Sequence, residues 1–465
     1  MQKRTIFLFL FILSCSATSE ETLVQESTLI SSSTTSTSTT STTSTTSTVG
    51  ISREFELPYK HSFYKLENCN DFLGSSHKVS CFEIPFIEKI FQFESPILNL
   101  TKSRNRQFAI SKDGIVYDLN IEKKEAEIIF DIRGQVFLES LESGLLSFFL
   151  HPNEDEFLVS YINKNNELVF ELFYFENEIQ NKTDSVTLLK VPIFATSHYG
   201  GGIFWSEYHA AYLVSIGDGT EANFESRLNH KPLDTNEYYG KIIAISGEGE
   251  FVKRKSLTLS STNEITKTNI IAAGLRNPWQ FFEFEDFLIV ADTGFTQNEE
   301  LNIYKYTTTT PIFGWPVFEA TKRSEDLDSI ENYSLDSELY FWDSNGQEDG
   351  LTYVEQNSIM PAFYYNHLPC YSEKNENCYG QTEIYRAAII GGDILSDINS
   401  DYNFDIYFAD YLSQELFSVN LITREVKIFP IPGILSITSI RVNYENKDEL
   451  IATSYDGSIY LIKLP

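Results

Sequence analysis

The sequence predicts an all-β fold, because its apolar runs are short, rich in Ile, Val, Phe and Tyr, and separated by turns of Asn, Asp and Gly. No long window repeats its apolar residues with the 3.6-residue period of an amphipathic helix. Six similar strand pairs follow one another along the chain. A β-propeller suits many such units in one domain, since its sheets shield one another's edges. A β-sandwich with long insertions is the alternative architecture.

The six units share one pattern: an apolar strand, a turn rich in Asn or charged residues, and a second apolar strand. Their sequences differ too much to fix the number of blades by themselves. The predicted strands pair, in chain order, as 108–110 with 115–117, 146–150 with 157–159, 203–205 with 211–215, 280–282 with 287–290, 389–392 with 405–408, and 439–442 with 450–453.

The first residues predict export. Residues 1–17 have the pattern of a signal peptide, with a basic start at Lys3 and Arg4, an apolar run, and small residues before the cleavage point. The run is too short to span a bilayer, and an uncleaved anchor is the alternative. Residues 18–50 form a Ser/Thr-rich stalk, predicted to be disordered because it cannot bury enough apolar surface. The folded domain is predicted over residues 51–465, in a secreted, extracellular protein without a transmembrane segment.

Export also predicts two covalent modifications. An even number of cysteines after the leader indicates disulfides, with four free thiols as the alternative. The simplest of three connectivities is local and pairs Cys69 with Cys81, and Cys370 with Cys378. Three N-x-S/T sequons predict glycosylation, at Asn99, Asn181 and Asn332.

The composition limits the partners. The formal net charge of −31 disfavours nucleic acid and anionic lipid surfaces. A solvated acidic surface explains this charge more simply than a specific cationic partner. The chain has 26 Tyr and 36 Phe, which we assign to packing between sheets rather than to carbohydrate stacking.

Polar motifs gather at the predicted strand ends, where loops place functional groups. The segment Gly274–Trp279 brings a cation and an amide, and Ala291–Gly294 follows with a carboxylate. His198–Gly202 offers a histidine before glycines, although a lone histidine there is more often an ordinary loop residue. Gly217–Gly219 is a turn that can present a carboxylate. Nothing resembles a zinc pair at helical spacing, a nucleotide-binding P-loop or a nucleophile elbow.

In this order the motifs resemble the soluble quinoprotein glucose/sorbosone dehydrogenases, whose propeller also occurs in bacterial aldose sugar dehydrogenases and animal Hedgehog-interacting-protein-like proteins. The resemblance runs from about residue 100 to the end of the chain. Besides the segments above, it includes Gly240-Lys241, Glu299-Glu300, Gly314–Glu319 and Gly391-Gly392. It implies a six-bladed propeller, in agreement with the six strand pairs.

The resemblance also implies a reaction, the oxidation of an aldose at C1. His198 would remove the proton of the C1 hydroxyl while hydride passes to pyrroloquinoline quinone (PQQ). Arg276 would stabilise the charge of the reduced quinone. The backbone carbonyls of Gly294 and Phe295 would bind Ca²⁺, a hard cation that prefers oxygen ligands. Three further residues would lie beside the cofactor: Asn277, Thr293 and Trp315.

Two departures from the pattern favour a second hypothesis. PQQ carries three carboxylates, yet Ser396 and Glu415 stand where such proteins commonly have basic residues. A carboxylate at Glu415 would repel the cofactor at short range. The alternative is a propeller without a cofactor, which binds a secreted protein or glycan as the Hedgehog-interacting relatives do. A secreted β protein without any small-molecule site is the third possibility. The enzyme hypothesis requires that His198 and Arg276 share one central cavity.

Overall fold

The computed structural model describes residues 78–464, except 104, 154, 176–181, 221–230, 235–236, 246–269, 296–297, 308, 324–349, 368–385, 397–403, 421–422 and 424. The predicted signal peptide and stalk therefore lie outside the described residues. So do three of the predicted disulfide cysteines and two of the sequons: Cys69, Cys370, Cys378, Asn181 and Asn332. Cys81 lies in the first strand, but its side chain is not among those described.

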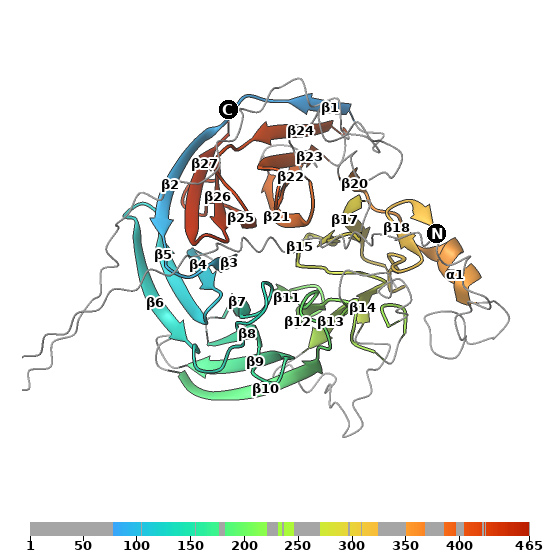
Figure 1. Ribbon diagram of the computed structural model, residues 1–465, viewed down its shortest axis with the longest axis horizontal. Coiled ribbons are helices and arrows are strands. Elements are labelled where there is room, and N and C mark those ends of the chain that lie inside the picture. The colour runs from blue at the N-terminus through green and yellow to red at the C-terminus, as the bar shows by residue number, and fades with distance from the viewer. Residues whose placement is uncertain are drawn as a thin grey trace, which may run out of the picture. The chain divides into compact units, whose positions relative to one another are not determined.

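The described part of the chain forms six sheets of four antiparallel strands, one of which is extended by a fifth strand, and we number them as blades 1 to 6 (Figure 1). A seventh sheet has only two strands and lies in an insertion. Blade 1 comprises β3 (Ile97–Ser103), β4 (Arg106–Ser111), β5 (Ile115–Asn120) and β6 (Glu125–Asp131). Blade 2 comprises β7 (Leu145–Leu150), β8 (Glu156–Ile162), β9 (Glu167–Phe175) and β10 (Lys182–Pro192). Blade 3 comprises β11 (Gly200–Ser206), β12 (Ala211–Ile216), β13 (Lys241–Ile245) and β14 (Ile270–Ala273).

The second half of the chain repeats this order. Blade 4 comprises β15 (Gln280–Phe284), β16 (Phe287–Asp292), β17 (Asn298–Lys305) and β20 (Phe363–Asn366). Blade 5 comprises β21 (Ile389–Ser396), β22 (Phe404–Asp410), β23 (Glu415–Asn420) and β24 (Glu425–Pro430). Blade 6 comprises β25 (Ile437–Val442), β26 (Glu449–Ser454) and β27 (Ser458–Lys463), and takes β2 (Phe86–Gln92) as its outermost strand.

The blades close into a ring. Each innermost strand contacts the innermost strand of the next blade, from β3 through β7, β11, β15, β21 and β25 back to β3. The ends of the folded chain meet in blade 6, because β2 pairs antiparallel with β27 (Figure 1). The strand before it, β1 (Lys78–Cys81), pairs parallel with β24 at the edge of blade 5. The predicted six-bladed β-propeller is thereby confirmed.

The core consists of six buried apolar clusters, one between each pair of neighbouring blades in the described structure. Aromatic rings fill these spaces: Phe108 of blade 1 lies 5.1 Å from Phe148 of blade 2, and Phe363 of blade 4 lies 5.4 Å from Phe408 of blade 5. The assignment of the aromatic residues to packing is confirmed for these buried rings.

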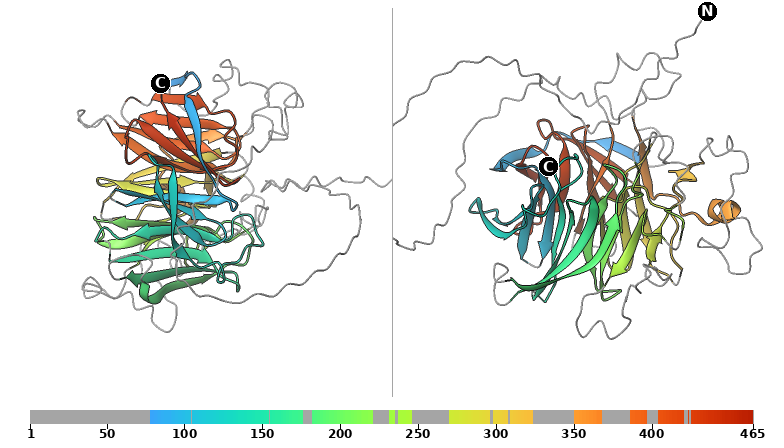
Figure 2. Two further views of the ribbon diagram at one scale, coloured as in Figure 1. Left: turned by 90° about the vertical axis from the view of Figure 1, so that its left-hand side faces the viewer. Right: turned by 60° about the horizontal axis from the view of Figure 1, so that its bottom comes forward.

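The predicted strand pairs fall in six different blades. Five are the two innermost strands of a blade, whereas the first pair corresponds to β4 and β5, one strand further out. A long insertion separates β17 from β20. It contains β18 (Phe318–Glu319), β19 (Lys322–Arg323) and helix α1 (Gly350–Asn357), which lies outside the ring (Figures 1 and 2). Within the described residues, no helix has the length and apolar character needed to cross a membrane.

One predicted glycosylation site does not fit the fold. Asn99 lies in the innermost strand of blade 1 and is 3% exposed. Its amide nitrogen donates a hydrogen bond to the carbonyl of Leu146, and its Oδ1 accepts one from Gln280. A glycan on this nitrogen has no space in the folded domain, so Asn99 is withdrawn as a glycosylation site.

Candidate functional site

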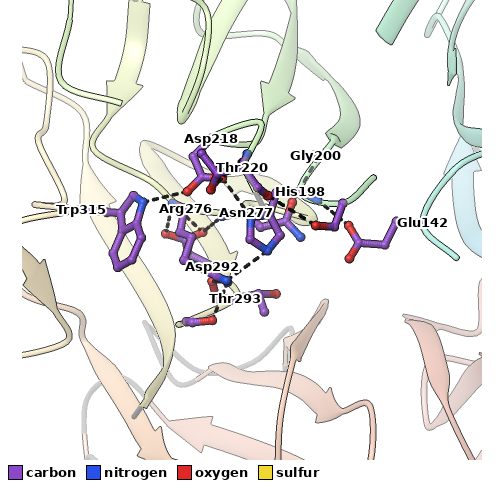
Figure 3. A network of polar contacts seen from close by, with 12 residues as sticks. Glu142, His198, Gly200, Asp218, Thr220, Arg276, Asn277, Asp292, Thr293 and Trp315 are labelled. Atoms are coloured by element: carbon purple, nitrogen blue, oxygen red, sulfur yellow. Dashed lines mark hydrogen bonds and ion pairs between the residues drawn. The ribbon is translucent and has the colours of Figure 1, made fainter. Parts of the chain in front are cut away.

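The hairpins of blades 3 and 4 bring the predicted polar residues to one face of the ring. In blade 3 Gly200 pairs with Ile216, so the residues before β11 and after β12 lie at the same end of that sheet. These residues include His198 and Asp218. Arg276 lies in the segment that leads into β15, at the equivalent end of blade 4. The structure thus confirms that His198 and Arg276 meet, since His198 Nε2 lies 3.0 Å from Arg276 Nη2 (Figure 3).

Three side chains form a hydrogen-bonded chain. His198 Nδ1 lies 2.9 Å from Asp218 Oδ1. Because a guanidinium can only donate, His198 Nε2 accepts the hydrogen bond from Arg276, and Nδ1 carries the proton that is donated to Asp218. This arrangement fixes both the tautomer and the orientation of the ring. The sequence indicated Asp218 only as a carboxylate in a turn. The structure shows that it lies beside His198.

The backbone holds His198 in a strained conformation. Its φ of 56° is left-handed, which costs about 1–2 kcal/mol for an L-residue. Two neighbours enforce it. The backbone N–H of His198 donates to Glu142 Oε2 at 2.7 Å. A Cβ at Gly217 would lie 2.0 Å from the carbonyl oxygen of His198, so only glycine leaves room for this loop. Backbone strain of this kind clusters at functional sites.

Asp292 anchors the segment that carries Arg276. Its carboxylate accepts hydrogen bonds from the backbone N–H groups of Arg276, at 2.9 Å, and of Asn277, at 2.7 Å. The Asn277 side chain then accepts a hydrogen bond from Gly200 N at 3.1 Å. Asn277 therefore ties blade 4 to blade 3 and positions the two halves of the site.

The Arg276 side chain is enclosed on several sides. Its Nη1 donates to the carbonyl oxygens of Thr293, at 3.0 Å, and of Gly294. Its guanidinium carbon lies 5.5 Å from the ring centre of Phe295 and 5.6 Å from that of Trp315, within the range of cation–π attraction. Trp315 is 4% exposed, and its indole N–H donates to Asp218 Oδ2 at 3.0 Å. Arg276 Nε is buried without a hydrogen-bond partner among the described residues.

Two carboxylates shape the loop after β16. Glu299 accepts a hydrogen bond from Gly294 N at 3.2 Å, and Glu319 accepts one from Phe295 N at 3.0 Å. These contacts hold the N–H groups of the loop, while the carbonyls of Thr293 and Gly294 accept from Arg276. A Cβ at Gly294 would lie 1.5 Å from the carbonyl oxygen of Asn298, so this tight loop requires glycine.

The charges of the site are balanced locally. Burial alone would raise the pKa of Asp218, but the interaction with His198, the charge of Arg276 and the hydrogen bond from Thr220 stabilise the carboxylate and hold its pKa below the ordinary value. Burial raises the pKa of Asp292, against the opposing hydrogen bonds and charge of the Arg276 segment. Glu300 pairs with Asp292 across β16 and β17, and burial together with that neighbouring charge raises its pKa.

Glu415 has a partner that neutralises it. Arg386 donates to both of its carboxylate oxygens, at 2.7 and 2.9 Å, and both side chains are buried. The expected repulsion of an anionic cofactor by Glu415 is therefore offset within the blade. The same pair leaves Arg386 engaged rather than open to a ligand. Ser396 ends β21, and its side chain is not among those described.

Lys241, which also belongs to the motifs named above, stabilises a loop rather than the site. Its ammonium donates to the carbonyls of Lys231 and Tyr239, at 2.7 and 2.9 Å. Burial lowers the pKa of Lys241 to about 7. This lysine holds the loop before β13, since no hydrogen bond links it to His198 or Arg276 in the described site.

Arg276 has opposite effects on the two groups that the resemblance implies, the quinone and calcium. A buried donor without a partner costs about 1–3 kcal/mol, so an oxygen atom of a bound quinone or sugar would satisfy Arg276 Nε. A divalent ion on the Gly294 carbonyl would lie beside the guanidinium that already donates to it. Two unit charges 4 Å apart repel by about 4 kcal/mol at an effective dielectric constant of about 20, and a divalent ion doubles this. Arg276 therefore offers a donor to an oxygen atom of a ligand, whereas its charge disfavours calcium on the Gly294 carbonyl.

These features define a class: a six-bladed propeller with a His–Asp–Arg site at one face of the ring. Solved structures share the fold. A glucose dehydrogenase aligns with 82% of this chain and 100% of its own at 13% identity and a TM-score of 0.55. A second glucose dehydrogenase aligns over the same shares at 12% identity and a TM-score of 0.54. An oxidoreductase of Thermus thermophilus, described as a glucose dehydrogenase, does so at 15% identity and a TM-score of 0.53.

At these identities the likeness shows the fold alone. The chain has a glucose-dehydrogenase-like propeller fold. No family model matches the sequence, and neither does any curated protein.

Proposed function

We propose that this protein is a secreted sugar dehydrogenase of the quinoprotein type, which oxidises an aldose at C1. The observation that carries the proposal is the hydrogen-bonded chain from Asp218 through His198 to Arg276. It presents a neutral imidazole nitrogen that can accept a proton, beside a fixed positive charge. The propeller fold of the three glucose dehydrogenases supports the same assignment by analogy.

The residues divide the work as follows. The C1 hydroxyl of the sugar replaces Arg276 Nη2 as the partner of His198 Nε2. His198 then takes the hydroxyl proton, and Asp218 stabilises the imidazolium that forms. As the proton leaves the oxygen, hydride leaves C1, so the C1–OH group becomes a C1=O group. PQQ, when bound, supplies the acceptor for this hydride. The Nε–H of Arg276 would then be placed to stabilise negative charge on an oxygen of the bound quinone.

The proposal is tested with purified protein, PQQ, a panel of aldoses and an artificial electron acceptor, with and without Ca²⁺. We expect turnover with at least one aldose. His198→Asn suits the left-handed backbone, because Asn adopts it more readily than most residues, yet it removes the base. We expect this variant to lose about 10²–10⁴-fold in rate.

The control for this variant is His209→Asn. His209 lies in the turn between β11 and β12, at the opposite end of the blade from His198. The His209→Asn variant should retain full activity. Absence of turnover with every sugar, or an undiminished rate in His198→Asn, contradicts the proposal.

A second candidate is a binding propeller without a cofactor. It is favoured by the engagement of two arginines, since Arg276 donates to Thr293, Gly294 and His198, and Arg386 is paired with Glu415. This candidate predicts no uptake of PQQ and saturable binding of a secreted protein or glycan in pull-downs from the secreted fraction. Titration of PQQ, followed by tryptophan fluorescence, separates the two candidates.

A further inference from the structure

The Arg276 guanidinium engages one of the two carbonyls on which the resemblance places calcium, that of Gly294, whereas no hydrogen bond to the second, that of Phe295, is present in the described structure. Its Nη1 donates to two successive backbone carbonyls, those of Thr293 and Gly294. The loop offers these oxygens because Glu299 and Glu319 engage its N–H groups. Carbonyl oxygens of this kind are typical ligands of Ca²⁺. In this protein the carbonyls of Thr293 and Gly294 instead accept hydrogen bonds from the Arg276 guanidinium.

The cation is also fixed on its other sides. Nη2 donates to His198, and the rings of Phe295 and Trp315 lie against the guanidinium. The described residues contain no group of three His, Cys, Asp or Glu side chains that could hold a metal elsewhere. Among the described residues the Nε–H of the guanidinium has no hydrogen-bond partner, so it is a donor available to a ligand.

We propose that Arg276 is the built-in cation of this site and takes the place of a divalent metal. A ligand oxygen beside His198 binds to Arg276 Nε–H, and no calcium is needed at the Gly294 carbonyl, which Arg276 already engages. The inference rests on the proposed location of the site, but not on its sugar oxidation.

Calcium titration tests this directly. Isothermal titration calorimetry at roughly physiological ionic strength, with Trp fluorescence recorded in parallel, is applied to the wild-type protein, Arg276→Met and Arg276→Lys. Methionine has a similar length but no charge, so it frees both carbonyls and removes the repulsion. Lysine keeps the charge and serves as the matched control. Calcium held weakly by the acidic surface contributes equally to all three proteins.

We expect no calcium-dependent change in tryptophan fluorescence for the wild-type protein or Arg276→Lys. Arg276→Met should bind Ca²⁺ at least about tenfold more tightly than Arg276→Lys, because the charge repulsion is gone. Stoichiometric calcium binding by the wild-type protein that changes this fluorescence overturns the inference, and so does equal affinity in the two variants. If Arg276→Met does not fold, calcium titration of the wild-type protein, repeated with EGTA present, still tests the inference. If calcium does not change the fluorescence of the wild-type protein and no aldose is oxidised, the proposed function is contradicted but this inference is not.

Discussion

At the scale of single residues, the site depends on one carboxylate that orients one imidazole. Asp218 accepts the Nδ1–H of His198 and also the indole N–H of Trp315. Asp218→Asn removes the charge that stabilises the imidazolium. We expect kcat to fall by about 10²–10⁴-fold with KM little changed, because the base acts only in the chemical step.

Trp315→Phe is the control for this prediction. It deletes the hydrogen bond to Asp218 but keeps the aromatic ring, so its rate should fall by less than that of Asp218→Asn. Steady-state kinetics on both variants make the comparison. A larger loss in Trp315→Phe would show that Asp218 does not act through His198.

A second residue-scale prediction concerns pH. Burial and the neighbouring Asp292 raise the pKa of Glu300 above its ordinary value of 4.5. The folded state therefore keeps a proton that the unfolded state releases as the pH rises past this ordinary value. Stability should fall as the pH rises from about 4.5 through neutral, by at most about 1.4 kcal/mol per pH unit for one proton.

Glu300→Gln should flatten this slope. The glutamine oxygen can still accept from Ala320 N. Asn302 Nδ2 now donates to Glu300 Oε2, so the Asn302 amide has to rotate by 180° for its Oδ1, which has no partner in the described structure, to accept from the new amide. Urea unfolding at several pH values between about 5 and 8 measures the effect. Glu83→Gln, a change at an exposed residue, is the control. Equal slopes for Glu300→Gln and the wild type would contradict the assignment.

The sequence revealed part of the residue-scale picture. His198 and Arg276 were found through motif order, and the Gly217–Gly219 turn indicated a carboxylate. Pairing that turn with His198 needed the register of the β11–β12 hairpin, which the sequence does not state. Glu142 gave no signal, because its contact with His198 N crosses between blades. The engagement of Arg276 with Gly294 likewise depends on loop geometry rather than on residue type.

At the scale of elements, the strands could be recognised from the sequence, but their positions from the innermost to the outermost strand of each blade could not. A strand such as β8 is buried along nearly its whole length, since another blade covers each face of its sheet. Its sequence is therefore a continuous apolar run without the alternation of a half-exposed strand. Only outer strands such as β6 show frequent exposure. This uniform burial explains why the first predicted pair was placed one strand too far out.

The element-scale prediction concerns aromatic packing between blades. Phe408 is fully buried and lies 5.0 Å from Phe417 and 5.4 Å from Phe363. Phe408→Ala should destabilise the protein by about 3–5 kcal/mol, because it leaves a cavity between blades 4 and 5. Phe194→Ala, at a ring that is 78% exposed, should change stability by less than about 0.5 kcal/mol. Chemical denaturation measures both, and a similar loss in the two variants would contradict the packing role.

At the scale of the whole molecule, closure of the ring depends on the first described strands. β2 pairs with β27 from the opposite end of the chain, and β1 extends blade 5. Removal of residues 1–92 would expose the edge of β27 and open the seam of blade 6. We expect broad, multi-step unfolding and self-association, measured by calorimetry and size-exclusion chromatography. A single sharp transition of a monomer would show that the ring closes without β2.

In the proposed reaction, His198 takes a proton from a sugar hydroxyl beside Arg276. The most direct test is a single turnover of the PQQ-loaded protein with an aldose carrying deuterium at C1, followed by absorbance of the quinone. We expect the quinone to be reduced, deuterium to slow the reduction, and His198→Asn to slow it by about 10²–10⁴-fold. A quinone that stays oxidised with every aldose, or is reduced equally fast in His198→Asn, would contradict the account.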